Sequence, residues 1–296
     1  MFENIFGNNS IKKVLEQSIY SNKVSHSYLM IGISGIGKKM IATEFAKDIL
    51  CLSENKSCNY CKSCIEFDGN NNPDFFCIEP EGSSIKIGQI RELQKRIQEK
   101  PIISEKKVYI IDQADLMTKE AQNCLLKTLE EPPEFATIIL VGTNENAFLT
   151  TIKSRCMILH FNPIEDMYIK KYLDEKYQIK NISQNMFDIF QGSIGKAILL
   201  KDNQEKYIKL EKIIEQLEQT DLIDVINKAD ILYKSKEEIF EMLDYINIIL
   251  LKKAKNNYVY TKCIKIVENT KKRLQQNSNY DMCIDNMVFN IWEEVN

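Results

Sequence analysis

A glycine-rich segment near the N-terminus constrains the fold more than any other part of the chain. Residues 32–38 follow the spacing of a phosphate-binding loop, which is a glycine, four residues, a second glycine and a lysine. An apolar run typical of a buried strand, Tyr28–Ile31, precedes the segment, and a helical pattern over Lys38–Leu50 follows it. A phosphate-binding loop requires this context. The alternative interpretation is an ordinary turn between a strand and a helix.

The pattern on both sides of this loop predicts an α/β fold. Apolar runs of strand length alternate with helical stripes as far as about residue 160, and such alternation is typical of a mostly parallel sheet covered by helices on both faces. The strand candidates are Tyr28–Ile31, Asp74–Ile78, Val108–Ile111 and Ile138–Val141, and the helical stripes lie at about 11–19, 38–50, 87–97 and 118–129.

After Pro163 the pattern changes to helical spacing without a convincing strand. A glycine-containing break at Gly192–Gly195 divides this region, and no proline follows Pro163. We therefore expect three domains: a core at 1–163, a small helical domain at 164–205 and a larger helical domain at 206–296.

The loop itself predicts phosphate binding but a damaged metal site. Gly32, Gly35 and Gly37 let backbone N–H groups turn toward phosphates, and Lys38 supplies a positive charge. The next position should carry Ser or Thr, whose hydroxyl binds Mg²⁺. Lys39 stands there instead. An ammonium group has no lone pair to give to a metal, so it repels the ion.

The end of the strand Val108–Ile111 shows a second departure. It delivers Asp112 to the carboxyl edge of the sheet, where ATPases place the Asp that orients the metal. The following residue, ordinarily a Glu that activates water, is Gln113. An amide accepts no proton usefully at neutral pH, so help from a general base is lost. Rescue by Asp115 is the alternative. Together the two departures predict that ATP is not hydrolysed, and they leave open whether nucleotide binds.

Four of the nine cysteines crowd into one short segment. Cys51, Cys58, Cys61 and Cys64 have the close spacing with which four thiolates wrap a structural Zn²⁺. An iron–sulfur cluster would use similar ligands, but its usual close fourth Cys followed by Pro is absent. Another metal, or none, remains the alternative. The other cysteines are interpreted as core thiols: Cys77, Cys124, Cys156, Cys263 and Cys283.

Composition limits the class of protein. The 44% hydrophobic and 27% charged content is that of a globular protein, and no apolar stretch is long enough to cross a membrane. The N-terminus shows no secretory signal, so we expect a cytoplasmic protein. A net charge of −3 argues against attraction of the whole chain to nucleic acid. Two basic groups, Lys252, Lys253 and Lys255 and then Lys271, Lys272 and Arg273, are interpreted as solvated helix faces, and local basic faces for nucleic acid are the alternative.

The order and spacing of several motifs resemble the clamp-loader family of bacterial DNA polymerase III, in its gamma/tau and delta-prime branch. Leu125–Pro133 is the most specific of these motifs. The others are Ser25–Leu29, the loop, the cysteine cluster, Pro73–Phe75, Ile78–Gly82, Ile85–Ile87, Asp112–Asp115 and Ser154–Cys156. The resemblance covers about residues 1–205 by motif, and the remainder only by length and helicity.

This resemblance implies an AAA+ core with a zinc-module insertion at about 51–64, a helical lid and an all-helical C-terminal collar. It implies a hetero-pentameric ring with delta and gamma/tau subunits, which loads the sliding clamp on primed DNA during DNA replication. In that ring Arg155 would supply an arginine finger to the ATP site of a neighbouring subunit. The fixed charge and fork of Arg suit phosphate oxygens. A surface salt bridge is the alternative role for Arg155.

Departures from the motor pattern favour the delta-prime branch. Besides Lys39 and Gln113, Gly195 stands where motor subunits of the family carry a nucleotide-sensing arginine, although Lys196 is next to it. Motor subunits of the family also carry an extension that reaches the polymerase, and we expect none here. We therefore expect a scaffold subunit of the polymerase III holoenzyme, with no polymerase site and no ATPase activity of its own. The alternatives are an ATP-hydrolysing gamma/tau-type motor and an unrelated zinc-containing DNA-binding module.

Overall fold

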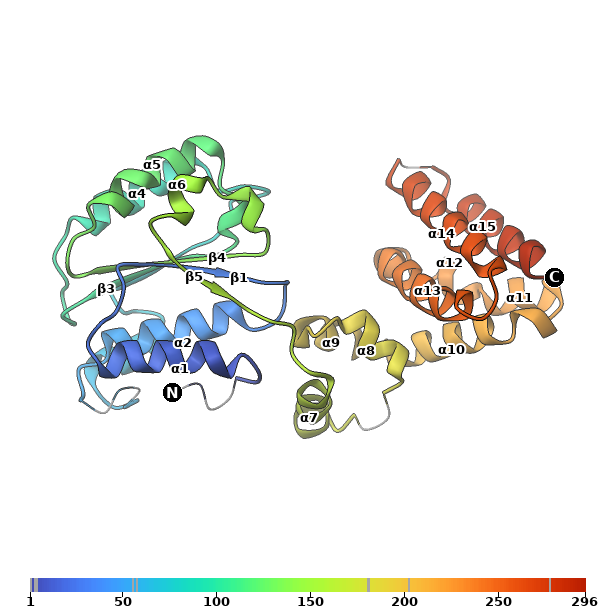
Figure 1. Cartoon of the computed structure of the whole chain (residues 1–296), viewed down its shortest axis with the longest axis horizontal. Coiled ribbons are helices and arrows are strands. Elements are labelled where there is room, and N and C mark those ends of the chain that lie inside the picture. The colour runs from blue at the N-terminus through green and yellow to red at the C-terminus, as the bar shows by residue number, and fades with distance from the viewer. Residues whose placement is uncertain are drawn as a thin grey trace. The chain divides into compact units, whose positions relative to one another are not determined.

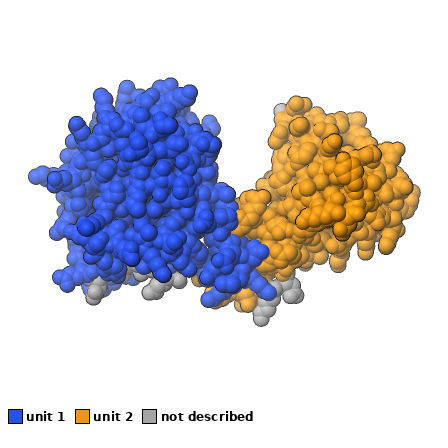
Figure 2. Space-filling view, in the orientation of Figure 1, with its two compact units in different colours: residues 1–172, 193–195 blue, residues 173–192, 196–296 orange. Residues whose placement is uncertain are grey.

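The computed structural model describes residues 2, 5–54, 56, 58–179, 182–201, 203–276 and 278–296. The chain forms two compact units, coloured separately in Figure 2. One contains residues 1–172 together with 193–195, and the other contains 173–192 and 196–296. The short segment 193–195 therefore belongs to the first unit, although its neighbours in sequence belong to the second.

The first unit is built on a five-stranded sheet whose strand pairs are all parallel, in the order β2-β3-β4-β1-β5. Every residue of the three central strands is buried, which explains their continuous apolar runs. The sheet confirms the predicted α/β class. Its strands are β1 (Ser27–Ile31), β2 (Phe75–Ile78), β3 (Lys107–Ile111), β4 (Ala136–Gly142) and β5 (Met157–His160).

Helices cover both faces of this sheet, as Figure 1 shows. On one face lie α1 (Asn9–Tyr20) and α2 (Lys38–Leu50), and on the other lie α4 (Ile87–Ile97), α5 (Lys119–Glu130) and α6 (Thr150–Lys153). The helix α3 (Lys62–Asp68) belongs to the cysteine-rich segment, and the short helices η1 (Ala114–Leu116) and η2 (Glu145–Ala147) lie in loops after β3 and β4.

The apolar stripes of α4 and α5 explain why they pack here. Ile90 and Leu93 of α4, and Leu125 of α5, join one buried cluster with Ile111 and Leu140 of the sheet. At the start of α5, the Thr118 hydroxyl accepts a hydrogen bond from the backbone N–H of Ala121 at 3.2 Å, which caps the helix.

The described residues after 163 are helical and contain no strand, as the pattern predicted. In the second unit α13, α14 and α15 pack against one another in sequence order. The helices from 166 onward are α7 (Asp166–Tyr177), α8 (Gln184–Phe190), α9 (Ile194–Lys201), α10 (Gln204–Glu215), η3 (Leu217–Gln219), α11 (Leu222–Lys228), α12 (Asp230–Tyr233), η4 (Lys236–Glu238), α13 (Ile239–Ala254), α14 (Val259–Gln275) and α15 (Tyr280–Val295). Over the part of the chain described, no helix has the length and apolar character needed to cross a membrane.

Candidate nucleotide and metal sites

The glycine-rich loop leaves the end of β1 and enters α2 directly. Gly35 and Gly37 have φ angles of 76° and 89°, a region that favours glycine. A Cβ atom on Gly32 would lie 2.8 Å from the carbonyl oxygen of Phe161, so that position has no room for a side chain either. The local geometry thus accounts for all three glycines.

Lys38 is folded back onto the loop rather than held away from it. It is 6% exposed, and its Nζ donates hydrogen bonds to the carbonyl oxygens of Gly32 at 2.8 Å and Ile33 at 2.7 Å. Burial lowers the pKa of Lys38, against the opposing attraction of Asp115 and Asp112. The ammonium therefore uses backbone carbonyls where a phosphate would otherwise be its partner.

Lys39 lies at the place expected for the metal. Its Nζ is 3.0 Å from Oδ2 of Asp112, and it also forms an ion pair with Glu79. Burial alone would lower the pKa of Lys39, but hydrogen bonds to the two carboxylates outweigh it and raise that pKa. Lys39 therefore places a positive charge against the Asp that would orient Mg²⁺.

Gln113 and Asp115 follow at the end of β3. The Gln113 backbone is left-handed, with φ of 49°, and the residue offers only an amide. Asp115 accepts hydrogen bonds from the Thr143 hydroxyl at 2.7 Å and from the backbone N–H of Asn144 at 3.2 Å. Its carboxylate thus connects two loops, which does not favour the alternative that it replaces a catalytic base.

Segment 193–195 closes on the loop. The backbone N–H of Gly195 donates to the carbonyl oxygen of Gly35 at 2.8 Å. A Cβ atom on Gly195 would lie 2.7 Å from the Cα of Gly35, and one on Gly35 would lie 2.3 Å from Oγ of Ser193. An arginine at position 195 would therefore force the two backbones apart. The absence of a side chain at this position fits the contact.

The four clustered cysteines converge as the spacing predicted. Their Sγ atoms all lie within 4.8 Å of one another, with 3.6 Å between Cys51 and Cys58 and 3.9 Å between Cys58 and Cys64. Tetrahedral zinc, with Zn–S bonds of about 2.3 Å, requires about 3.8 Å between sulfurs. The sulfurs therefore fit a zinc ion, which would be closed to water by four thiolates.

Backbone groups already favour one thiolate in this cluster. Burial raises the pKa of Cys61, but hydrogen bonds from the backbone of Cys64 and Leu52 and from neighbouring thiols outweigh it, lowering that pKa to about 6. The bond from the N–H of Cys64 lies at the start of α3. A thiolate at a helix start is a ready metal ligand.

The remaining cysteines follow the expectation only in part. Cys263 and Cys283 are buried, and Cys124 and Cys156 are half-buried. Cys77 is exposed, so the prediction of a core thiol was wrong there. The reason is that β2 is an edge strand of the sheet.

Arg155 lies at the amino ends of the parallel strands, whereas the loop lies at their carboxyl ends. It precedes β5, and its carbonyl oxygen accepts a hydrogen bond from the Ser27 hydroxyl at 2.6 Å, at the start of β1. The loop begins where β1 ends, five residues later, about 15 Å along the strand. Arg155 therefore cannot serve phosphates in its own chain's loop.

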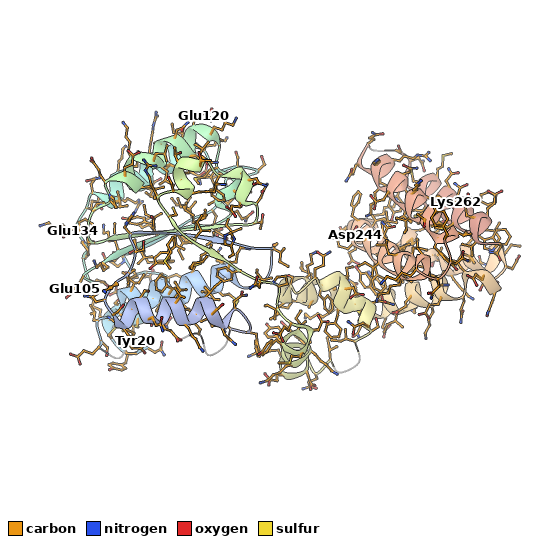
Figure 3. The ribbon with its side chains drawn as sticks, viewed as in Figure 1. Tyr20, Glu105, Glu120, Glu134, Asp244 and Lys262 are labelled. Atoms are coloured by element: carbon orange, nitrogen blue, oxygen red, sulfur yellow. The ribbon has the colours of Figure 1, made fainter. Side chains whose placement is uncertain are left out.

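Two carboxylates at these sites were not predicted. Glu79 pairs with Lys39, and Glu130 lies 2.8 Å from Arg155. The position of Glu79 directly after β2, beside the end of β3, could have revealed it. Figure 3 labels Glu120 in the first turn of α5 and Glu134 beyond its last, which marks the direction of the helix that carries Glu130.

The parallel sheet, its strand order and the loop between β1 and α2 define a P-loop core of the AAA+ type, joined to helical segments. Residues 7–165 match the protein family described as "DNA polymerase III, delta subunit". The chain therefore belongs to the DNA polymerase III delta-subunit family, within the clamp-loader group that also holds the gamma/tau subunits.

Individual relatives agree with this assignment. DNA polymerase III subunit delta' of Bacillus subtilis is 34% identical over 213 residues, which are 70% of this chain and 64% of that protein. DNA polymerase III subunit gamma/tau of Mycoplasma genitalium is 31% identical over 306 residues, covering 95% of this chain and 51% of the relative. The chain thus spans less than two thirds of either relative.

A solved structure shares the fold. The DNA polymerase III gamma subunit-related protein of Thermotoga maritima superimposes with a TM-score of 0.50 at 18% identity, covering 97% of this chain and 99% of that one.

Proposed function

We propose that the chain is a non-motor subunit of a DNA polymerase III clamp loader, of the delta-prime type. The observation that carries the proposal is the ion pair of Lys39 with Asp112 at 3.0 Å. It places a side-chain cation on the carboxylate that would orient Mg²⁺, while Gln113 leaves attacking water without a base. The chain then contributes structure and a trans-acting arginine rather than its own turnover.

The proposed assembly follows from membership of the family. The partners are the delta and gamma/tau subunits of a hetero-pentameric ring, which loads the sliding clamp on primed DNA. The core at 1–163, the lid at 164–205 and the collar at 206–296 would take the scaffolding, hinge and oligomerisation roles. Arg155 is the residue through which this chain acts on the neighbour's nucleotide.

A gamma/tau-type motor is the second candidate, and the intact Gly32, Gly37 and Lys38 favour it. We expect the purified chain to hydrolyse ATP no faster than its Lys38→Ala variant, because both lack a metal site and a base. Phosphate release with Mg²⁺ and ATP in excess is the measurement. Turnover that Lys38→Ala abolishes would establish the motor instead.

Lys39→Thr tests the cause directly. Removing the ammonium frees Asp112, and the new hydroxyl supplies the missing metal ligand. We expect Mg²⁺ to tighten binding of a fluorescent ATP analogue by at least about tenfold in the variant, a difference of about 1.4 kcal/mol, and not in the parent. Lys62→Thr is the matched control, since Lys62 lies in α3. Equal Mg²⁺ dependence in parent and Lys39→Thr would contradict the role of Lys39.

A further inference from the structure

The carboxylate of Glu130 holds one side of the Arg155 guanidinium. Oε1 of Glu130, the last residue of α5, lies 2.8 Å from Nη2 of Arg155. The Arg155 side chain keeps 33% of its surface exposed, so a partner can still reach it. Its Nη1 donates to the carbonyl oxygen of Thr151 at 3.0 Å and to the Ser154 hydroxyl at 3.3 Å. Both ends of the guanidinium fork are therefore held.

Hydrogen bonds connect α5, which carries Glu130, to the segment that leads to Arg155. Gln122, 2% exposed in α5, donates to the carbonyl oxygen of Ala147 at 2.9 Å. Its Oε1 accepts from the backbone N–H of Leu149 at 2.9 Å, directly before α6. Helix α5 thus contacts the segment that carries Arg155 at two places. Gln122, near the start of α5, binds the backbone of that segment, and Glu130, at the end of α5, binds Arg155 itself.

An arginine finger needs such support because a free Arg side chain has many rotamers and loses their entropy when it is held in one. The backbone of Arg155 is fixed by Ser27 at 2.6 Å, but this bond leaves the side chain free to turn. Thr151 and Ser154 belong to the same short segment as Arg155, whereas Glu130 belongs to another helix. Among the described residues that hold the guanidinium, Glu130 is the one that lies outside this segment, in α5.

We propose that Glu130 is the positioning residue of Arg155: it orients the guanidinium so that the exposed part faces a nucleotide on a neighbouring subunit. The proposal rests on the proposed trans-acting role of Arg155. Glu130 touches no nucleotide and acts through Arg155 alone. Its loss should therefore lower the kcat of the assembled loader while the KM for ATP stays unchanged.

The test uses the complete loader reconstituted with Glu130→Lys, whose ammonium repels the guanidinium. We expect a drop of about 1.4- to fivefold in kcat at this interface, which corresponds to the contribution of about 0.2–1 kcal/mol of an exposed ion pair. Glu130→Gln keeps the size and one acceptor oxygen, and should lose about half as much on a logarithmic scale. Glu131→Lys carries the same charge change on the adjacent exposed residue and should leave the rate unchanged.

A double-mutant cycle separates this proposal from the one on which it rests. In an Arg155→Ala background, Glu130→Lys should cause no further loss. If Arg155→Ala itself leaves turnover unchanged in an assembled complex, the finger fails. If Arg155→Ala lowers turnover but both Glu130 variants match the parent, only the positioning role fails. Faster turnover with Glu130→Gln would overturn the proposal too, because Glu130 would then hold Arg155 away from its target.

Discussion

Cys61→Ser is expected to abolish zinc binding by this chain and to lower its melting temperature by about 10 °C. The four sulfurs lie within 4.8 Å of one another, and a serine hydroxyl replaces a thiolate poorly at zinc. Loss of a structural metal is among the few single changes that cost about 4 kcal/mol or more, and 1 kcal/mol shifts Tm by about 2–4 °C in a domain of 150–250 residues. Metal analysis and thermal unfolding measure the two effects.

The control is Cys77→Ser, which removes an exposed thiol outside the cluster. It should retain one Zn²⁺ per chain and unfold at the same melting temperature as the parent. Treatment of the parent with a chelator should reproduce the Cys61→Ser melting curve, because binding free energy at such a site is also folding free energy. A parent protein free of metal yet as stable as before would refute the zinc site.

The sequence predicted the central strands well because burial and pattern agree there. The helix predicted over Lys38–Leu50 has those bounds in the structure, since the loop glycines fix its start. Strand β5 was not predicted. It is a short edge strand of which only Leu159 is buried, so its residues show no continuous apolar run.

In the candidate sites, the sequence predicted groups that are close along the chain and missed contacts between distant residues. Cysteine spacing within 14 residues of chain predicted a cluster because the ligands are local in sequence. Glu79 and Glu130 lie 40 and 25 residues from the side chains they contact, Lys39 and Arg155. Only the strand order and the path of α5 bring these pairs together. The charge of a glutamate in a sequence with 42 acidic residues carries no such information.

Arg155→Ala is expected to lower ATP hydrolysis by the assembled loader while leaving this chain folded and assembled. The side chain is one-third exposed, so the loss of its ion pair with Glu130 should change stability by about 1 kcal/mol or less. At a single site an arginine finger can contribute about 10³-fold or more to phosphoryl transfer. The loss measured on the complete loader should be smaller, because the other interfaces of the proposed ring would keep their own fingers.

The position of Arg155 in the sheet determines which nucleotide the substitution can affect. Arg155 lies at the amino edge, beside the start of β1, whereas Lys38 and Asp112 lie at the carboxyl edge. Any effect on hydrolysis must therefore act on a nucleotide in another chain. Arg155→Lys should recover little activity, because one ammonium cannot replace the planar fork. Clamp- and DNA-stimulated turnover is the measurement, with assembly verified by gel filtration. Full turnover in an assembled Arg155→Ala complex would leave Arg155 as a surface partner of Glu130 and nothing more.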